Sequence, residues 1–482
     1  MNWKPVKNDR WGHPRQLWML LGVTVGLNFA FYGFRAFLAP YIAQTFFAAL
    51  AAGDAMRHAD RLVSGFGALL YATPIIGGYV ADNILGEVRA LQVALWLGAL
   101  AGALMAWPGL LGFELALALY VLGAGLSIPL TVLIGRNYPG DDPRRDAGYT
   151  LFYLAINFGA FVAPFICAAW IGHHYGYRYG FIAASIGMAL AALLLQRRGK
   201  RLQGIVPAGP QRQRPRAMLK VLLVMLAVLY PTALLLQHPQ VLDIAMYALM
   251  GLLVVYFIVS GVRRRDRVQA QRYMAMLLLF AANIAFWALS LQGVSSLNFF
   301  ARDFVRAPFD FTLFQSFNPL YILVLAPFMA LLWPWLDKRG GNPSTPRKFG
   351  IGLLLVALSY GVTAYGIGHW ADAGGRVSWW LLALCYLLQT VGELALSPIG
   401  YAMVTRLAAP DEASLAMGGW FFGVAIAYDV SGQIAALTTT AAIPGIAGYA
   451  QVYSSLYWIG LGAAAVFLLA APWITRLMHG AR

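Results

Sequence analysis

The chain has 482 residues, of which 60% are hydrophobic and only 11% are charged. A soluble protein carries about 25% charged residues, so the composition excludes an ordinary soluble fold and predicts an all-α protein that crosses the membrane many times. The formal net charge of +16 could indicate nucleic-acid binding, but the basic residues follow a pattern that membrane topology explains, so we expect no nucleic-acid partner.

Apolar segments bounded by charged residues, Gly and Pro predict fourteen transmembrane helices. In chain order the expected ranges are 17–47, 60–84, 88–107, 111–136, 146–172, 177–197, 217–236, 240–262, 273–303, 311–336, 346–367, 377–407, 412–440 and 449–478. Several are longer than the about 20 residues that span the hydrocarbon core, which predicts tilted or kinked helices. The basic N-terminus has no cleavable signal pattern, so we expect the first helix to direct insertion.

The basic residues are distributed unevenly between the two sides of the predicted membrane. Of the 35 Lys and Arg residues, 28 lie in the termini and loops of one side and six on the other side. Because cytoplasmic loops are enriched in Lys and Arg, both termini are predicted to be cytoplasmic.

Composition also divides the chain into domains. A basic linker rich in Pro and Gln, 198–216, follows an N-terminal six-helix bundle, 1–197. Two nearly uncharged helices without a polar stripe come next, and we interpret 217–262 as an inserted two-helix hairpin. The remainder, 263–482, is predicted to be a C-terminal six-helix bundle. Two six-helix halves predict a substrate site between them near the membrane midplane.

The segment GGYVADNILGEVR joins the second and third predicted helices. Its Gly78, Asp82, Gly86 and Arg89 have the spacing G-x3-D-x3-G-x2-R. The small residues allow close helix approach, and Asp82 can cap a helix or pair with a basic group. The pattern resembles the cytoplasmic loop motif of the major facilitator superfamily.

Longer segments resemble one family within that superfamily, the proton-coupled oligopeptide transporters. They are FYGFRAFLAPY, DAGYTLFYLAINFGAFVAP, LFQSFNPLYILVLAP, PSTPRKFGIGLLL and LLQTVGELALSPIGYAMV, and the similarity extends from about residue 24 to residue 440. Bacterial members of this family carry an inserted hairpin between their halves. The resemblance implies a major facilitator fold with 6 + 2 + 6 helices, placed in the cell inner membrane, and we expect a monomer.

Glu393 interrupts an apolar segment, 386–404, where a carboxylate costs about 2.5–3.5 kcal/mol on insertion scales. Gln389 and Ser397 lie four residues to either side, so the three polar residues share one helix face. The resemblance implies that Glu393 faces a central cavity and contacts the amino terminus of a peptide. The alternative is a carboxylate satisfied by a neighbouring helix, with no role in substrate binding.

The resemblance assigns further polar and aromatic residues to the wall of the substrate cavity. Tyr153 and Asn157 are four residues apart, and we expect them to share one face of a helix. The full predicted set is Tyr32, Tyr153, Asn157, Gln292, Ser296, Asn318, Glu393 and Trp420. For each residue the alternative is a structural contact between helices.

Arg35 and Asp303 are predicted to form a gate. Arg35 lies about 27 Å along an outward-running helix, at its periplasmic end. Asp303 ends the helix predicted over 273–303 on the same side, where the family also places an acidic partner. The alternative for Arg35 is an arginine whose head group reaches the membrane interface.

The chain departs from the family where charged residues are expected. The family's E-x-x-E-R motif is replaced by Thr24, Val25, Gly26, Leu27 and Asn28, and Ile128 stands at a lysine position. Losing one charge of such a network would leave a buried partner unpaired at a cost of several kcal/mol, whereas losing all of them avoids that cost. In the family, the arginine and lysine that are absent from this chain would bind a peptide's carboxylate.

The groups implied for the amino end of a peptide remain in this chain: Asn157, Asn318 and Glu393. We therefore expect a pocket that favours an amine and does not depend on a free carboxylate in its substrate. Leu291 also stands where the family often carries a glutamate, directly before Gln292.

Asp429 is a second carboxylate inside an apolar segment. No histidine lies in the middle of a predicted span, so Glu393 and Asp429 are the candidate proton carriers, because desolvation favours the protonated form of a carboxyl group. The alternative for Asp429 is pairing at a helix crossing. Nine residues separate it from Trp420, which places the two on opposite helix faces.

The predicted function is secondary active transport of di- or tripeptides, or of peptide-like amine-bearing solutes, by alternating access and with an atypical route of proton coupling. The alternatives are transport or export of a non-peptide amine-bearing solute, and a non-transporting receptor on the same fold. No H-E-x-x-H, G-x-S-x-G or P-loop motif is present, so we predict neither an enzyme nor ATP drive. No cofactor or metal is expected, and the predicted partners are the solute, protons and the lipid bilayer.

Overall fold

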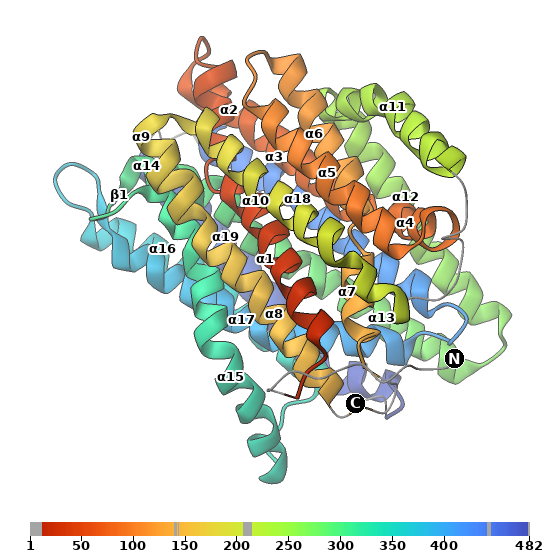
Figure 1. Ribbon diagram of the computed structural model, residues 1–482. Helices are drawn as coiled ribbons and strands as arrows, with labels where there is room; N and C mark the ends of the chain where they lie inside the picture. Colours follow the sequence, from red (N-terminus) through yellow and green to blue (C-terminus); the bar gives the residue numbers. More distant parts are fainter. Residues whose placement is uncertain (1–11, 139–141, 143, 206–214, 441–444, 481–482) are drawn as a thin grey trace. The chain divides into compact units, whose positions relative to one another are not determined.

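The structure, a computed structural model, describes residues 12–138, 142, 144–205, 215–440 and 445–480. It is almost entirely helical (Figure 1). Among the described residues, fourteen helical segments are long and apolar enough to cross a membrane, which confirms the predicted number. Two-residue strands, β1 (Val305–Arg306) and β2 (Val377–Ser378), pair in parallel outside these segments.

The chain divides into two compact units. The first unit contains Met1–Tyr41 and Leu69–Gln237, and the second contains Ile42–Ala68 and His238–Arg482. The helix α3 (Ala52–Ala72) therefore contributes most of its length to the second unit. The two helices predicted as a hairpin, α11 (Pro215–Gln237) and α12 (Pro239–Arg263), fall in different units.

The first unit is built from helices that include short π and 3-10 segments. Its elements are α1 (Arg15–Arg35), α4 (Pro74–Val80), the π segment Ala81–Leu85, α5 (Glu87–Met105), α6 (Leu110–Gly125), α7 (Pro129–Gly135), α8 (Arg144–Ala163), the π segment Pro164–Gly172, α9 (His173–Tyr175), α10 (Tyr177–Arg198), the 3-10 segment Gly199–Gly204 and α11. The helix α2 (Leu38–Phe46) begins in this unit and ends in the second.

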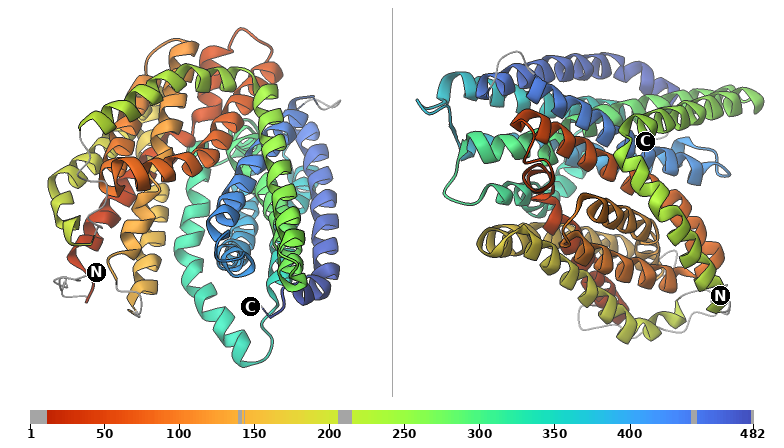
Figure 2. Two further views of the ribbon diagram at one scale, coloured as in Figure 1. Left: turned by 90° about the vertical axis from the view of Figure 1, so that its right-hand side faces the viewer. Right: turned by 90° about the horizontal axis from the view of Figure 1, so that it is seen from above.

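The second unit also consists mainly of long helices, as the views in Figure 2 show. Its elements after α12 are α13 (Arg267–Ser290), the 3-10 segment Leu291–Val294, α14 (Ser296–Phe304), β1, the 3-10 segment Phe311–Ser316, α15 (Phe317–Lys338), α16 (Thr345–Trp370), β2, α17 (Trp379–Leu407), α18 (Ala413–Thr440) and α19 (Ile446–Leu477). Small residues bring α16 and α19 together, because a Cβ on Gly460 would lie 2.9 Å from Ala357 Cβ.

Two of the predicted helices are interrupted a few residues before a proline. The segment predicted over 17–47 breaks after Arg35, and α2 resumes at Leu38 with Pro40 in its first turn. The segment predicted over 111–136 breaks after Gly125 and resumes at Pro129. Proline lacks an N–H group and fits the first turn of a helix better than its interior, so each break lies just before a proline.

The segment predicted over 273–303 is also broken, between α13 and α14. A 3-10 turn, Leu291–Val294, and the non-helical Ser295 separate the two helices. The carbonyl of Gly293, which lies in this turn, accepts hydrogen bonds from the Gln315 amide and the Tyr386 hydroxyl. Side chains from neighbouring elements therefore satisfy a backbone group at the break, which stabilises the kink.

Candidate functional site

The helices α15 and α17 hold Asn318 and Glu393 in direct contact. Asn318 Nδ2 donates hydrogen bonds to Glu393 Oε2 at 2.8 Å and to Thr390 Oγ1 at 3.0 Å. Both Asn318 and Glu393 are half-buried. An amide donates a hydrogen bond without adding positive charge, so an ionised Glu393 keeps its attraction for an ammonium group. Two of the three residues assigned to the amine end, Asn318 and Glu393, are thus neighbours.

Gln389 lies one turn before Glu393 but is oriented toward a different helix. Its Nε2 donates to Ser359 Oγ at 3.2 Å and to Tyr360 OH at 3.4 Å, both on α16. The side chain is only 4% exposed. The predicted polar stripe therefore separates into a half-buried carboxylate facing α15 and a buried amide that joins α17 to α16.

Gln292 and Ser296 form hydrogen bonds at the break between α13 and α14. Ser296 Oγ donates to Gln292 Oε1 at 2.6 Å, and Gln292 Nε2 donates to Ser431 O and Oγ at 2.9 and 3.0 Å. Both Gln292 and Ser296 are 0% exposed. The structure gives these two residues a packing role between helices, and their contact with a substrate stays a prediction.

Trp420 is part of the hydrophobic core of the second unit. It is 1% exposed and lies edge-on to the rings of Phe280, Phe349 and Tyr401. Gly400 allows the indole to approach, since a Cβ there would be 2.3 Å from the ring. In this packing Trp420 is part of the core, and its place in the wall of a substrate cavity stays a prediction.

The predicted residues of the first unit lie on α1 and α8. On α8, Asn157 is 5% exposed and its Nδ2 donates to the Tyr153 carbonyl at 2.9 Å. On α1, the Arg35 guanidinium lies 5.2 Å from the centre of the Tyr32 ring, within cation–π range. These contacts lie within single helices and fix the orientation of the side chains.

Asp303, the predicted acidic partner of Arg35, lies near the end of α14 in the second unit. Its carboxylate accepts two hydrogen bonds from the neighbouring Arg302, at 2.7 and 2.8 Å. The gate between Arg35 and Asp303 stays a prediction, and any such contact has to compete with Arg302.

The loop motif forms the connection between α4 and α5. Gly86 has φ = 79°, a conformation that favours glycine, which explains the residue at this position. The prediction that Gly78 allows close approach is wrong, since a Cβ there would meet nothing within 4 Å. Its neighbour Gly77 has that role, because a Cβ there would lie 2.0 Å from the Gly125 carbonyl oxygen. Asp82 and Arg89 are both exposed.

Asp429 lies where α18 meets α12. Tyr247 OH donates to Asp429 Oδ2 at 2.5 Å, and Gln433 Nε2 donates to the same oxygen at 3.0 Å. Asp243, one turn before Tyr247, lies near Asp429. The prediction that Asp429 and Trp420 face opposite ways is confirmed, because Trp420 points into the core.

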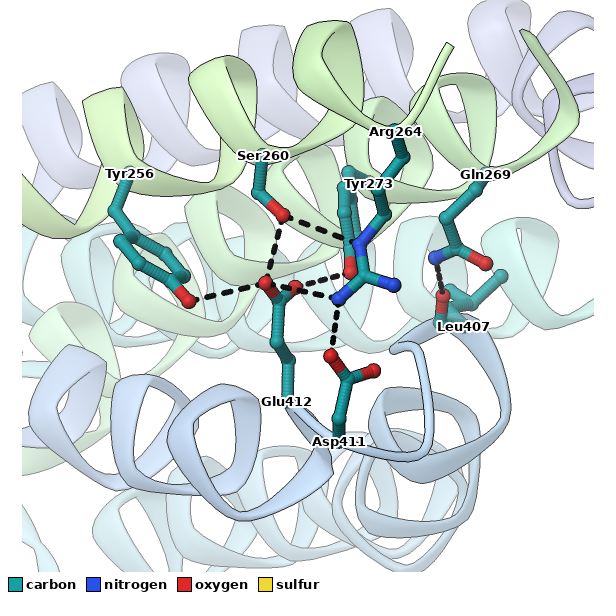
Figure 3. A network of polar contacts seen from close by, with 8 residues as sticks. All are labelled: Tyr256, Ser260, Arg264, Gln269, Tyr273, Leu407, Asp411 and Glu412. Atoms are coloured by element: carbon teal, nitrogen blue, oxygen red, sulfur yellow. Dashed lines mark hydrogen bonds and ion pairs between the residues drawn. The ribbon is translucent and has the colours of Figure 1, made fainter. Parts of the chain in front are cut away.

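A second polar cluster, shown in Figure 3, joins α12 to the loop between α17 and α18. Glu412 Oε1 accepts from Tyr256 OH at 3.0 Å and from Ser260 Oγ at 2.6 Å, and Oε2 accepts from Tyr273 OH. Arg264 lies 3.2 Å from Glu412. Desolvation acts to raise the pKa of Glu412, but these hydrogen bonds outweigh it and lower the pKa to about 2.

Sequence reasoning missed both clusters because it found no polar stripe on α12. Tyr256, Ser260 and Arg264 are spaced four residues apart and share one helix face, and Asp243 and Tyr247 have the same spacing. This spacing was the available signal. The cluster around Asp429 joins α12 to α18, and the cluster around Glu412 joins α12 to the loop before α18.

These features define the class of the protein. Fourteen apolar helices in two helical units, with carboxylates inside the spans, are characteristic of a secondary transporter with a major facilitator fold. The structure is similar to that of a mutant peptide transporter POT in complex with alafosfalin, with a TM-score of 0.84, 31% identity and coverage of 98% of this chain and 97% of that one. A POT family transporter in complex with 5-aminolevulinic acid matches with a TM-score of 0.82, 26% identity and coverage of 98% and 99%.

The sequence comparisons give the family. The family model described as the POT family matches residues 92–459, and the chain belongs to this family of transporters. The uncharacterized transporter YclF of Bacillus subtilis is 32% identical, over 97% of this chain and 96% of the relative. The peptide transporter YePEPT of Yersinia enterocolitica is 33% identical, over 85% of each chain. Dipeptide and tripeptide permease B of Xenorhabdus bovienii is 30% identical, over 97% of each chain.

Proposed function

We propose that this transporter moves di- or tripeptides, or peptide-like amine-bearing solutes, across the inner membrane by alternating access, with Glu393 binding the amine. The contact between Asn318 and Glu393 carries the proposal, because the Asn318 amide orients a half-buried carboxylate and itself adds no positive charge. An ammonium group can make charge-assisted hydrogen bonds to such a carboxylate. The names of the relatives, which include a peptide transporter and dipeptide and tripeptide permeases, agree with this substrate class.

A non-peptide amine is the second candidate. One similar structure holds 5-aminolevulinic acid, an amine-bearing solute that is not a peptide. A pocket that recognises mainly the amine would accept both kinds of molecule, since the cations that are missing at Asn28 and Ile128 would otherwise select for a peptide's carboxylate. An amine is therefore the group that we expect both the peptide and the non-peptide substrates to need.

Uptake into proteoliposomes tests both candidates. Purified protein is reconstituted and supplied with labelled dialanine, trialanine or 5-aminolevulinic acid, with and without an inward proton gradient. N-acetylated dialanine is the matched control, because acetylation removes the ammonium group and leaves the rest of the peptide. We expect uptake of free-amine solutes and at least tenfold less uptake of the acetylated peptide. Equal uptake of both forms would contradict amine recognition.

Proton coupling and topology complete the proposal. Glu393 and Asp429 are the carriers proposed from sequence, and Tyr247 and Gln433 hold the Asp429 carboxylate where α18 meets α12. Both termini are proposed to be cytoplasmic, the active form to be a monomer, and Arg35 and Asp303 to form the gate. The excess of basic residues in one set of loops supports this orientation.

A further inference from the structure

Asp60 on α3 is buried without a polar partner. It is 1% exposed, and neither carboxyl oxygen has surface exposure or a hydrogen-bond partner among the described residues. Buried side-chain carboxyl groups almost always have such partners. Asp60 is the first residue of the helix predicted over 60–84.

The packing of α3 on α18 explains the burial. A Cβ on Gly432 would lie 2.2 Å from Ser64 Oγ and 3.6 Å from the Asp60 carbonyl oxygen, so the backbone of α18 lies directly against this turn of α3. One turn further along, a Cβ on Gly67 would lie 2.2 Å from the Tyr428 ring. Glycine on each helix therefore allows a contact that excludes water from the face carrying Asp60.

Two arginines on α3 lie close to Asp60 in the sequence. Arg57 pairs with Asp54, and Arg61 is exposed at the surface of the helix. From α19, Tyr449 is the titratable group that faces Asp60.

From α14, Arg302 and Asp303 lie near the same tyrosine, and they pair with each other. From α18, Gly432 lies next to Asp60, whereas Tyr428 lies against Gly67 and Asp429 is oriented toward α12. Among the described residues, no hydrogen bond or ion pair reaches the Asp60 carboxyl oxygens.

We propose that Asp60 is a proton-binding site of this transporter: its carboxyl group carries a proton while α3 is packed against α18, and it releases that proton to water when the two helices separate. An ionised carboxylate without hydrogen bonds is strongly disfavoured in a buried position, whereas the neutral acid is tolerated. Separation would hydrate the group and allow it to ionise. Proton binding is thereby linked to one arrangement of α3 and α18.

This inference rests on the proposed function for its transport assay, but it adds a carrier that the family resemblance does not supply. The chain lacks the two glutamates of the helix 1 motif, since Thr24 to Asn28 contain no acidic residue. Asp60 supplies a carboxyl group in a different helix. Its proton would be exchanged at the end of α3 that the proposed topology places toward the periplasm.

The test uses full-length protein in proteoliposomes, comparing wild type with Asp60→Asn. Asparagine keeps the shape of the neutral acid but cannot ionise, so the packed arrangement is retained. We expect Asp60→Asn to lose proton-driven accumulation of labelled dialanine at least tenfold, while exchange of dialanine without a gradient stays within about twofold of wild type. Asp54→Asn, on the same helix, is the matched control and should accumulate dialanine like wild type.

Infrared spectroscopy supplies a readout that does not depend on transport. The C=O stretch of a protonated carboxyl group at neutral pH should be present in wild type, weaker by one group in Asp60→Asn and unchanged in Asp54→Asn. This arm remains decisive if wild type transports no peptide, so failure of the proposed function and failure of this inference are distinguishable.

Three outcomes would overturn the proposal. The first is that Asp60→Asn accumulates dialanine normally under a proton gradient. The second is that Asp60→Asn loses exchange without a gradient as well as accumulation. The third is that the infrared difference between wild type and Asp60→Asn lacks the band of a protonated carboxyl group. The second outcome would show that Asp60 supports the movement of the helices and not its coupling to protons.

Discussion

Glu393 is a carboxylate with a neutral hydrogen-bond partner inside a membrane span. Asn318 orients it, and Thr390 receives the second hydrogen bond from the same amide nitrogen. A cationic neighbour would compete with a substrate amine, whereas an amide does not. The Asn318 amide therefore orients the carboxylate without adding a competing positive charge of its own.

Replacing Glu393 with Gln should weaken binding of an amine-bearing peptide by at least about tenfold, which corresponds to about 1.4 kcal/mol. The substitution keeps the shape and removes the charge. Binding of labelled dialanine to purified protein measures the effect, and thermal unfolding checks that the variant is folded. Asn318→Ala keeps the charge and should reduce affinity less. Wild-type affinity in Glu393→Gln would exclude Glu393 from amine binding.

Individual residues also show which features of the site could be predicted from the sequence and which could not. The pairing of Asn318 with Glu393 agrees with the family pattern, and Asp429 was identified from its position in an apolar segment. Gln292, Ser296 and Trp420 were assigned to a cavity wall; all three are buried here, and the assignment stays a prediction. Helical periodicity gives the face on which a residue lies, but it does not give which helix covers that face.

At the scale of helices, number and type were predictable from hydropathy, whereas the interruptions were not. Runs of apolar residues define spans irrespective of local backbone geometry, so all fourteen were found within the described residues. The break at Ser295 depends on side chains from α17 and the Phe311–Ser316 segment that reach the Gly293 carbonyl. Such long-range contacts leave no periodic signal in the sequence of the broken helix.

The Glu412 cluster makes α12 a stably attached helix. We expect Glu412→Gln to lower the free energy of unfolding at neutral pH by about 1–3 kcal/mol, since the buried Tyr273 hydroxyl and those of Tyr256 and Ser260 lose a charged acceptor. Thermal unfolding in detergent measures this change. Asp411→Asn is the matched control: this carboxylate contacts the same Arg264, but it is exposed and should contribute little.

The same cluster predicts a pH dependence. The pKa of Glu412 is lowered from 4.5 to about 2 in the folded protein, so its stabilisation is present above about pH 4.5 and is lost as the pH falls toward 2. The difference in stability between wild type and Glu412→Gln should therefore shrink across this interval. A difference that is unchanged between pH 6 and pH 3, roughly the two sides of that interval, would contradict the role given to the charge.

At the scale of the whole molecule, alternating access requires contacts that form and break between the helical halves. Reversing Arg35 to Asp or Asp303 to Arg should each reduce peptide uptake at least about tenfold, and the double reversal should recover part of it, because opposite charges are restored. Uptake into proteoliposomes measures all four forms. Arg302→Gln is an informative control, since it frees Asp303 from its present partner. Purely additive losses in the double variant would show that the two residues do not form a gate.

The absence of the family's arginine and lysine should change what the transporter requires at the other end of a peptide. Asn28, which stands at the arginine position, donates its side-chain amide to the Thr24 carbonyl of its own helix at 2.9 Å, and Ile128 at the lysine position is 38% exposed and uncharged. A substrate carboxylate would therefore lose charge-assisted hydrogen bonds in this region. It would also be repelled by Glu393 if both groups entered one cavity.

Dipeptides with an amidated C-terminus should accordingly bind this transporter at least as well as the free acids. In relatives that keep the arginine and lysine, the free acid should bind better, because the carboxylate then has its cationic partners. Competition against labelled dialanine, with matched acid and amide dipeptides, measures the difference in both proteins. A strong preference for the free acid here would show that another cation, with Arg35 the first to test, has taken over the carboxylate, and recognition of both peptide ends would then be retained by a different set of residues.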